Sequence, residues 1–195
     1  MKNRKALLIV DVQNDFCPGG ALGVPEADKI IPAINKYAKI FSKNKFPIFA
    51  TRDWHPVRTR HFKDFGGKWP VHCIQGSRGA AFHPKLKLPK EVFWVYKGIY
   101  PDKDGYSAFE AEDERGLSVL RLLERLGIKE LYIAGLATDY CVKYTSHDAI
   151  KHGFRVRILI DAIKGVDVNP GDSLKALKEM VRLGAKKISL KDMED

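Results

Sequence analysis

The stretch KALLIVDV, from Lys5 to Val12, decides the fold of this chain. Its apolar residues follow one another from Ala6 to Val10 without a polar interruption. A continuous apolar run of this length is typical of a strand that is covered on both faces of a sheet. The run ends at Asp11, so a carboxylate is expected just beyond the carboxyl end of this strand.

Strand and helix patterns alternate along the rest of the chain. Further strands are predicted at 47–51, 91–97, 130–134, 155–160 and 187–190, and helices at 28–43, 114–126, 138–152 and 170–183. Three of the helices are followed by Gly127, Gly153 or Gly184, which suit the position after a helix end. This alternation predicts an α/β fold, a three-layer αβα arrangement around a central, mainly parallel, doubly wound sheet of about six strands.

Length and composition indicate one cytoplasmic domain. The 195 residues, 45% of them hydrophobic, suffice for one core, and we predict a single domain over 1–195. No segment approaches a membrane span, and Ala6 to Val10 is too short for a signal-peptide core. Cys17, Cys73 and Cys141 form neither a disulfide framework nor a C-x-x-C zinc pattern. A reducing compartment, the cytoplasm, fits best.

The net charge of +10 raises the question of a nucleic-acid partner. The basic residues are spread widely, in small groups at 85–90, 151–157 and 186–191. No RNP-type, zinc-finger or arginine-rich motif accompanies them. We therefore expect no nucleic-acid or membrane partner and assign the charge to solubility and to acidic small ligands. A monomer and a homo-oligomer both remain open.

Reactive side chains follow the predicted strands at their carboxyl ends, where ligands bind in open α/β sheets. Asp11 follows the first strand, Lys97 ends the third, and Cys141 lies past the fourth, at the start of a helix. Taken singly, Asp11 suits a turn cap, Lys97 a solvated loop and Cys141 a small packing residue. Together they form a nucleophile set, in which the amine stabilises a thiolate and the carboxylate accepts its proton. The helix start would also lower the pKa of the thiol and hold an oxyanion.

The second strand leads into a long irregular segment, 53–90, which is rich in glycine, histidine and tryptophan. Connections this long inside a compact domain are uncommon and are usually functional. Asp53 and His55 share one side of an extended segment, and His61 and His72 follow in the loop. Ordinary polar loop residues are one reading of this group. The other is a site for Zn²⁺, Fe²⁺ or Mn²⁺ with open positions for water or substrate.

Five motifs in order resemble the nicotinamidase/pyrazinamidase branch of the isochorismatase-like cysteine hydrolases, over nearly the whole chain. These motifs are DVQNDFCPGG at 11–20, TRDWHP at 51–56, WPVHCIQG at 69–76, Lys97-Gly98 with DGYSAF at 104–109, and GLATDYCV at 135–142. The resemblance implies hydrolysis of nicotinamide to nicotinate and ammonia, and also of pyrazinamide, through a cysteine thioester in NAD salvage.

The resemblance also implies a role for individual residues. It implies a catalytic set of Asp11, Lys97 and Cys141, and one divalent ion held by Asp53, His55 and His72. Zinc is the first expectation for that ion, with Fe²⁺ and Mn²⁺ as alternatives, and His61 falls where relatives place a variable or water-mediated ligand. The peptide before Ala137 is expected to be cis, and the N–H groups of Ala137 and Cys141 to form an oxyanion hole. Phe16 and Trp69 match residues that enclose the pyridine ring, although both also suit simple core packing.

Two rival functions make different predictions. Another amidase of the same superfamily, acting on a carbamoyl or ureido substrate, would keep Asp11, Lys97 and Cys141 but bind no stoichiometric metal. A non-catalytic binding module or nucleic-acid binder would show no thioester chemistry, and its binding to nucleic acid would weaken steeply with salt.

Overall fold

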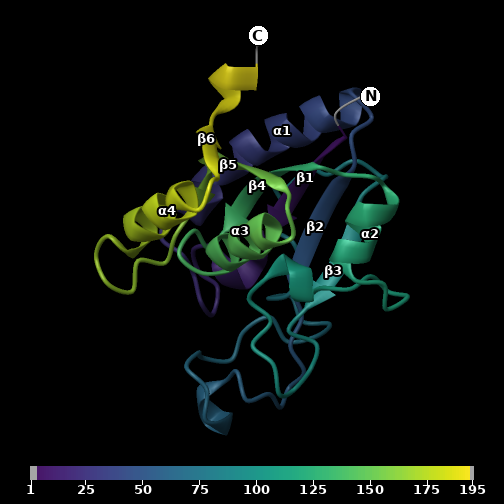
Figure 1. The fold of residues 1–195 in the computed structure, drawn as a ribbon. Coiled ribbons are helices and arrows are strands. Elements are labelled where there is room, and N and C mark those ends of the chain that lie inside the picture. Colours follow the sequence, from purple (N-terminus) through teal and green to yellow (C-terminus); the bar gives the residue numbers. More distant parts are fainter. Residues whose placement is uncertain (1–3, 194–195) are drawn as a thin grey trace.

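The computed structural model describes residues 4–193, which form one sheet between two layers of helices (Figure 1). The strands are β1 (Lys5–Val10), β2 (Ile48–Asp53), β3 (Phe93–Lys97), β4 (Glu130–Leu136), β5 (Arg155–Lys164) and β6 (Lys186–Ile188). The α-helices are α1 (Ile31–Lys43), α2 (Val119–Arg125), α3 (Cys141–Lys151) and α4 (Asp172–Arg182). All five strand pairings are parallel, in the order β3-β2-β1-β4-β5-β6. The predicted three-layer, doubly wound α/β fold is confirmed.

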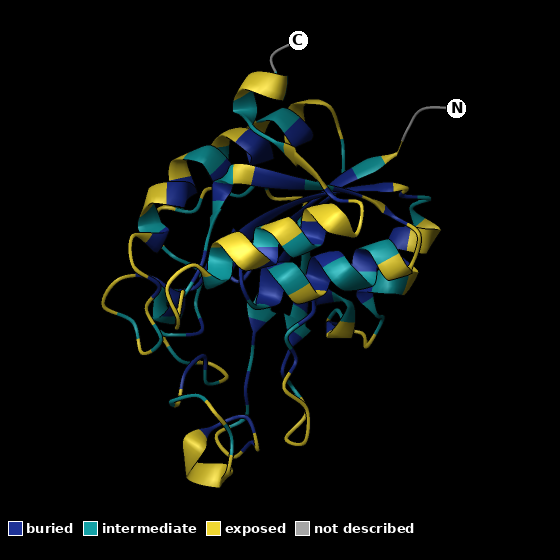
Figure 2. Cartoon of the chain, turned by 60° about the vertical axis from the view of Figure 1, so that its left-hand side comes forward, coloured by how far each residue is buried: buried dark blue, intermediate teal, exposed yellow. Residues whose placement is uncertain are grey.

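The apolar run of β1 supplies both halves of the core. Leu7 and Ile9 pack on the face that α1 covers, whereas Leu8 and Val10 face the layer of α2, α3 and α4. Successive side chains of a strand point to opposite faces, so only an uninterrupted apolar run can serve two helical layers. Figure 2 shows the result, with buried strands in the middle and helices exposed along their outer sides.

All four predicted helices begin later than expected, at Ile31, Val119, Cys141 and Asp172, and two of these late starts have a clear local cause. The helix predicted from Glu114 begins at Val119, because the Asp113 side chain accepts the N–H groups of Arg115 and Leu117 and folds that stretch into a turn. Ser118 then caps the helix by accepting the N–H of Arg121. The helix predicted from residue 138 begins at Cys141, since Tyr140 has non-helical backbone angles. The cysteine is therefore the first helical residue.

The carboxyl ends of β1 and β4 lie side by side at the point where the sheet reverses its direction of winding. A crevice opens at such a switch point, which makes it the expected binding position in this class of fold. The connection from β2 to β3 extends beyond the same edge of the sheet (Figure 1). Within residues 4–193, no helix combines the length and the apolar character needed to cross a membrane.

Candidate active site

Lys97, the last residue of β3, lies between two carboxylates and a thiol. Its Nζ is 2.9 Å from Asp11 Oδ2, 2.9 Å from Asp53 Oδ1 and 3.6 Å from Cys141 Sγ. All four side chains are buried. The structure thus brings the three predicted catalytic residues together, from the ends of β1, β3 and β4, and joins them to a predicted metal ligand.

Asp11 is held in a fixed orientation beside this amine. Its backbone lies in the left-handed region, with φ of 48°, a conformation that aspartate tolerates better than most residues. Thr51 of β2 donates its hydroxyl to Asp11 Oδ1 at 2.6 Å and accepts the Asp11 N–H at 3.1 Å. One carboxylate oxygen is thereby committed to Thr51, and the other faces Lys97.

Burial and charge act against each other in this group. Burial raises the pKa of Asp11 in spite of Lys97, which makes the carboxylate a better proton acceptor. Burial alone would lower the pKa of Lys97, but Asp11 and Asp53 raise it well above its usual range. The amine is therefore a permanent cation between the two carboxylates.

The nucleophile differs from the sequence-based expectation in one respect. Burial raises the pKa of the Cys141 thiol, and this effect together with Asp11 and Asp53 outweighs the lowering by Lys97. The expected lowering at a helix start is wrong for this residue, because desolvation disfavours the thiolate. A thiol with a raised pKa needs a base to become reactive, and the Asp11 carboxylate contacts the same lysine amine as the thiol.

Asp53, His55, His61 and His72 form a compact cluster at the same edge of the sheet. Each offers one donor atom, and the four atoms all lie within 4.8 Å of one another. Asp53 Oδ2 is 3.0 Å from His55 Nε2 and 3.4 Å from His72 Nε2. Three imidazoles and a carboxylate, all buried, suit zinc or a similar divalent transition metal. The structure brings His61 into the cluster together with the three predicted ligands.

Two of the three imidazoles, those of His61 and His72, are oriented by contacts outside the cluster. His72 Nδ1 lies 2.7 Å from the carbonyl oxygen of Pro70, and His61 Nδ1 lies 2.8 Å from Asp104 Oδ1. These contacts assign the proton to Nδ1 and leave Nε2 free to bind a metal. Burial lowers the pKa of His61 to about 4, so its ring stays neutral, as a metal ligand must.

Asp53, the carboxylate residue of the cluster, is fixed by contacts to its side chain and to its backbone. Burial raises the pKa of Asp53, but Lys97 and His55 lower it well below its usual range. The Gln13 side chain accepts the Asp53 N–H at 2.8 Å and donates to the Asp53 carbonyl at 2.8 Å. The Asp53 side chain is therefore an anion. Its Oδ1 contacts Lys97, and its Oδ2 contacts His55 and His72.

Gly98 leaves room for the cluster, and replacing it by alanine should disrupt the site. At its φ of 67°, a Cβ would lie 2.5 Å from His55 Cε1 and 2.8 Å from His55 Nδ1. We expect Gly98→Ala to destabilise the fold by about 2 kcal/mol and to reduce zinc binding, because the left-handed backbone alone disfavours alanine by roughly 1–2 kcal/mol. Urea unfolding and zinc content measure both effects.

The matched control is Gly153→Ala. Gly153 has a φ of 80° and no neighbour within 4 Å of an added Cβ, so it carries the backbone effect without the collision. Equal zinc binding in the two variants would show that the contact with His55 does not matter.

Backbone donors lie beside the thiol. The peptide between Leu136 and Ala137 is cis, as the resemblance implies. The Ala137 carbonyl accepts the N–H groups of Tyr140 and Val142, which fixes the turn before α3. Within residues 4–193, neither the Ala137 N–H nor the Cys141 N–H donates to another protein group. Both remain free to bind an oxyanion next to Sγ.

One cavity joins the thiol to the metal cluster. Its wall is largely aromatic and aliphatic, and Phe16 and Trp69 both line it. The Phe16 ring is 5.4 Å from that of His72, and Trp69 donates its indole N–H to the Tyr106 hydroxyl at 2.8 Å. The lining also includes Leu22, Asp53, His61, His72, Tyr106, Leu136, Ala137, Tyr140, Cys141 and Val166. This cavity suits a flat aromatic ligand with one polar substituent.

A family model for the isochorismatase domain matches residues 5–192. The chain belongs to the isochorismatase family. Escherichia coli nicotinamidase is 38% identical to it, over 98% of this chain and 97% of that protein. The resemblance to the nicotinamidase/pyrazinamidase branch is thereby confirmed.

Two solved structures resemble this chain over nearly its whole length. The pyrazinamidase of Pyrococcus horikoshii in complex with zinc has a TM-score of 0.88 and 46% identity, covering 95% of this chain and 99% of that one. PnC1 from L. infantum in complex with nicotinate has a TM-score of 0.86 and 33% identity, covering 98% of this chain and 95% of that one.

Several residues of this isochorismatase-family site were not assigned a role from the sequence. Gln13, Tyr106 and Tyr140 stand inside the recognised motifs, so their position was a usable signal. Leu22 and Val166 close the cavity from two separate loops, and nothing in the local sequence marks them. Asp139 holds Val166 in place by accepting the N–H groups of Val166 and Asp167.

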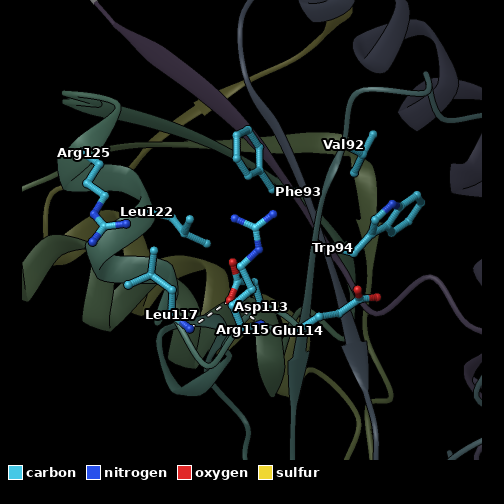
Figure 3. Close-up of a pocket in the computed structure, with 9 residues that line it drawn as sticks. All are labelled: Val92, Phe93, Trp94, Asp113, Glu114, Arg115, Leu117, Leu122 and Arg125. Carbon is cyan, nitrogen blue, oxygen red and sulfur yellow. Dashed lines mark hydrogen bonds between the residues drawn. The ribbon is translucent and has the colours of Figure 1, made fainter.

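A second groove lies at the outer edge of β3, away from this site (Figure 3). Val92, Phe93 and Trp94 form one wall, and the Asp113 turn with two residues of α2 forms the other. No thiol, imidazole or lysine amine lines it within the described residues. The groove therefore does not compete with the cavity at Cys141 as a reaction site.

Proposed function

We propose that this protein hydrolyses nicotinamide to nicotinate and ammonia, in NAD salvage, and also acts on pyrazinamide. The single observation that carries the proposal is a buried amine that contacts Asp11, Asp53 and the Cys141 thiol beside a cluster of histidines. Escherichia coli nicotinamidase, at 38% identity, supports the substrate. An amidase acting on a carbamoyl or ureido substrate would need Asp11, Lys97 and Cys141 but not the histidine cluster.

The first half of the reaction forms a thioester. Asp11 accepts the Cys141 proton, and the Lys97 cation stabilises the resulting thiolate. Sγ attacks the carboxamide carbon, and the N–H groups of Ala137 and Cys141 hold the oxyanion. Asp11 then returns the proton to the amide nitrogen, the C–N bond breaks, and ammonia leaves.

The second half releases nicotinate. Water attacks the thioester carbon while Asp11 accepts its proton, and the oxyanion occupies the same two N–H groups. The C–S bond breaks, and the proton on Asp11 returns to the Cys141 sulfur. Asp11 therefore acts as base and acid in both halves, in line with its raised pKa.

Asp53, His55, His61 and His72 would hold a divalent ion, and we propose zinc, with Fe²⁺ and Mn²⁺ as alternatives. Such an ion would supply a Lewis-acidic anchor for the ring nitrogen of the substrate. Phe16 and Trp69 would bind the ring itself. Three free, buried thiols favour a reducing compartment, and we propose the cytoplasm.

His72→Ala should lose the metal and raise KM for nicotinamide. The substitution removes a donor atom from the cluster, so zinc affinity should fall by about 100-fold or more. Mutating a residue that only hydrogen-bonds to a metal ligand typically costs about 10- to 100-fold. Zinc per chain and ammonia release measure the two effects. His152→Ala, at an exposed histidine outside the cluster, is the control. An unchanged zinc content in His72→Ala would show that the ligand set is wrong.

A further inference from the structure

The Asp15 carboxylate bridges two loops that both contribute residues to the cavity wall. Its Oδ2 accepts the backbone N–H of Cys73 at 2.7 Å, and its Oδ1 accepts the backbone N–H of Ala21 at 3.2 Å. Cys73 directly follows the metal-cluster residue His72, and Asp15 directly precedes the cavity residue Phe16. Asp15 is therefore joined to Phe16 by the chain and to the residue after His72 by a hydrogen bond.

The contact with Cys73 is made where the backbone needs support. Cys73 has a φ of 45°, in the left-handed region that a residue with a Cβ seldom adopts. A hydrogen bond to a carboxylate is about twice as strong as one between neutral groups. The Asp15 carboxylate thus stabilises the turn that points His72 toward the cluster.

The surrounding residues hold the carboxylate in one position. Gly79 lies against it, and a Cβ at Gly79 would overlap the Asp15 side-chain oxygens. The Gly79 carbonyl also accepts the Asp15 N–H at 3.0 Å. Another rotamer of Asp15 would break its side-chain hydrogen bonds to Cys73 and Ala21.

We propose that Asp15 is a positioning residue that couples the metal cluster to the substrate-binding wall. It holds His72 through the Cys73 N–H and holds Phe16 through its own backbone, and the centroids of the two rings lie 5.4 Å apart. This inference rests on the proposed function of the site. Because such coupling is reciprocal, metal binding strengthens substrate binding and substrate binding strengthens metal binding.

The test compares Asp15→Asn and Asp15→Ala with the wild type. Asparagine keeps the shape and one acceptor oxygen but loses the charge and the second hydrogen bond, whereas alanine loses both bonds. Asp64→Asn is the matched control, because Asp64 lies in the loop 53–90 that contains Cys73, is exposed and makes no side-chain hydrogen bond within residues 4–193. Zinc affinity of the metal-free proteins is measured by competition with a chromophoric chelator, and the visible spectrum of the cobalt-loaded proteins reports ligand geometry.

We expect zinc affinity to fall by roughly tenfold or more in Asp15→Ala, by less in Asp15→Asn and not at all in Asp64→Asn. With saturating zinc, KM for nicotinamide should rise while kcat changes little, because Asp11, Lys97 and Cys141 are untouched. If Asp15→Ala does not fold, the zinc affinity, cobalt spectrum and KM of Asp15→Asn decide whether Asp15 has the positioning role. Wild-type zinc affinity, cobalt spectrum and KM in Asp15→Asn would overturn the proposal, even if the variant unfolds more easily.

The wild-type measurements separate this inference from the proposed function. Wild-type protein that binds zinc but releases no ammonia from nicotinamide would contradict the function, whereas the effect of Asp15 on zinc affinity would still decide the positioning role. Wild-type protein that binds neither zinc, Fe²⁺ nor Mn²⁺ would overturn the positioning role, whereas ammonia release from nicotinamide would still decide the function.

Discussion

Cys141→Ala is expected to abolish ammonia release from nicotinamide while zinc binding stays at the wild-type level. The thiol lies in the cavity 3.6 Å from Lys97 Nζ and does not belong to the metal cluster. No other thiol lines the cavity within the described residues, so no substitute nucleophile is available for the first step. Removing a nucleophile of this kind lowers kcat by about 10⁴-fold or more.

Cys17→Ala is the matched control for this variant. Cys17 is also buried and unpaired, but it does not line the cavity, so its replacement should leave turnover near the wild-type value. Ammonia release is followed in both variants at equal zinc content. Turnover that persists in Cys141→Ala would exclude Cys141 as the nucleophile.

Asp11→Asn should stop the reaction before the thioester forms. The asparagine has the same shape and can still accept the Thr51 hydroxyl, which Asp11 Oδ1 accepts at 2.6 Å. It cannot accept the thiol proton, and the pKa of that thiol is raised by burial. Loss of a positioned base lowers kcat by about 10²- to 10⁴-fold.

The measurement for Asp11→Asn is mass spectrometry of acid-quenched enzyme, which detects an acyl group on Cys141. Asp161→Asn serves as the control, since Asp161 is a partly buried carboxylate that accepts hydrogen bonds from Tyr37 and Leu190 outside the cavity. A stoichiometric thioester in Asp11→Asn would show that another group takes the thiol proton.

The fold could be predicted because its strongest signals are local. The apolar run Ala6 to Val10 and the alternation that follows it indicate a covered parallel sheet without any knowledge of distant contacts. The start of α2 could not be predicted in the same way. Glu114 and its neighbours fit a helical pattern, but the Asp113 side chain captures two backbone N–H groups and forms a turn instead.

The approximate place of the site could be predicted for a similar reason. Parallel strands bring their carboxyl ends to one edge of the sheet, so Asp11, Lys97 and Cys141 could be expected at that edge. Their direct contact depends on the strand order, in which β2 lies between β3 and β1. The parts that the sequence did not reveal depend on tertiary contacts. Asp15 acts on a backbone N–H 58 residues away, and Val166 reaches the cavity from the loop after β5.

The pKa of the thiol shows the same limit. A cysteine at a helix start is expected to ionise easily, and the position at the start of α3 is confirmed. Burial beside two carboxylates reverses the direction, and burial is a property of the whole fold. This difference supports the proposed role of Asp11 as the base of the first step.

The most direct test of the account is an assay of the purified, zinc-loaded protein with nicotinamide, in which ammonia, nicotinate and bound zinc are measured together. The account predicts equimolar ammonia and nicotinate from protein that holds a stoichiometric amount of zinc, with zinc removal by a chelator raising KM. Protein that binds zinc stoichiometrically but releases neither product would contradict it.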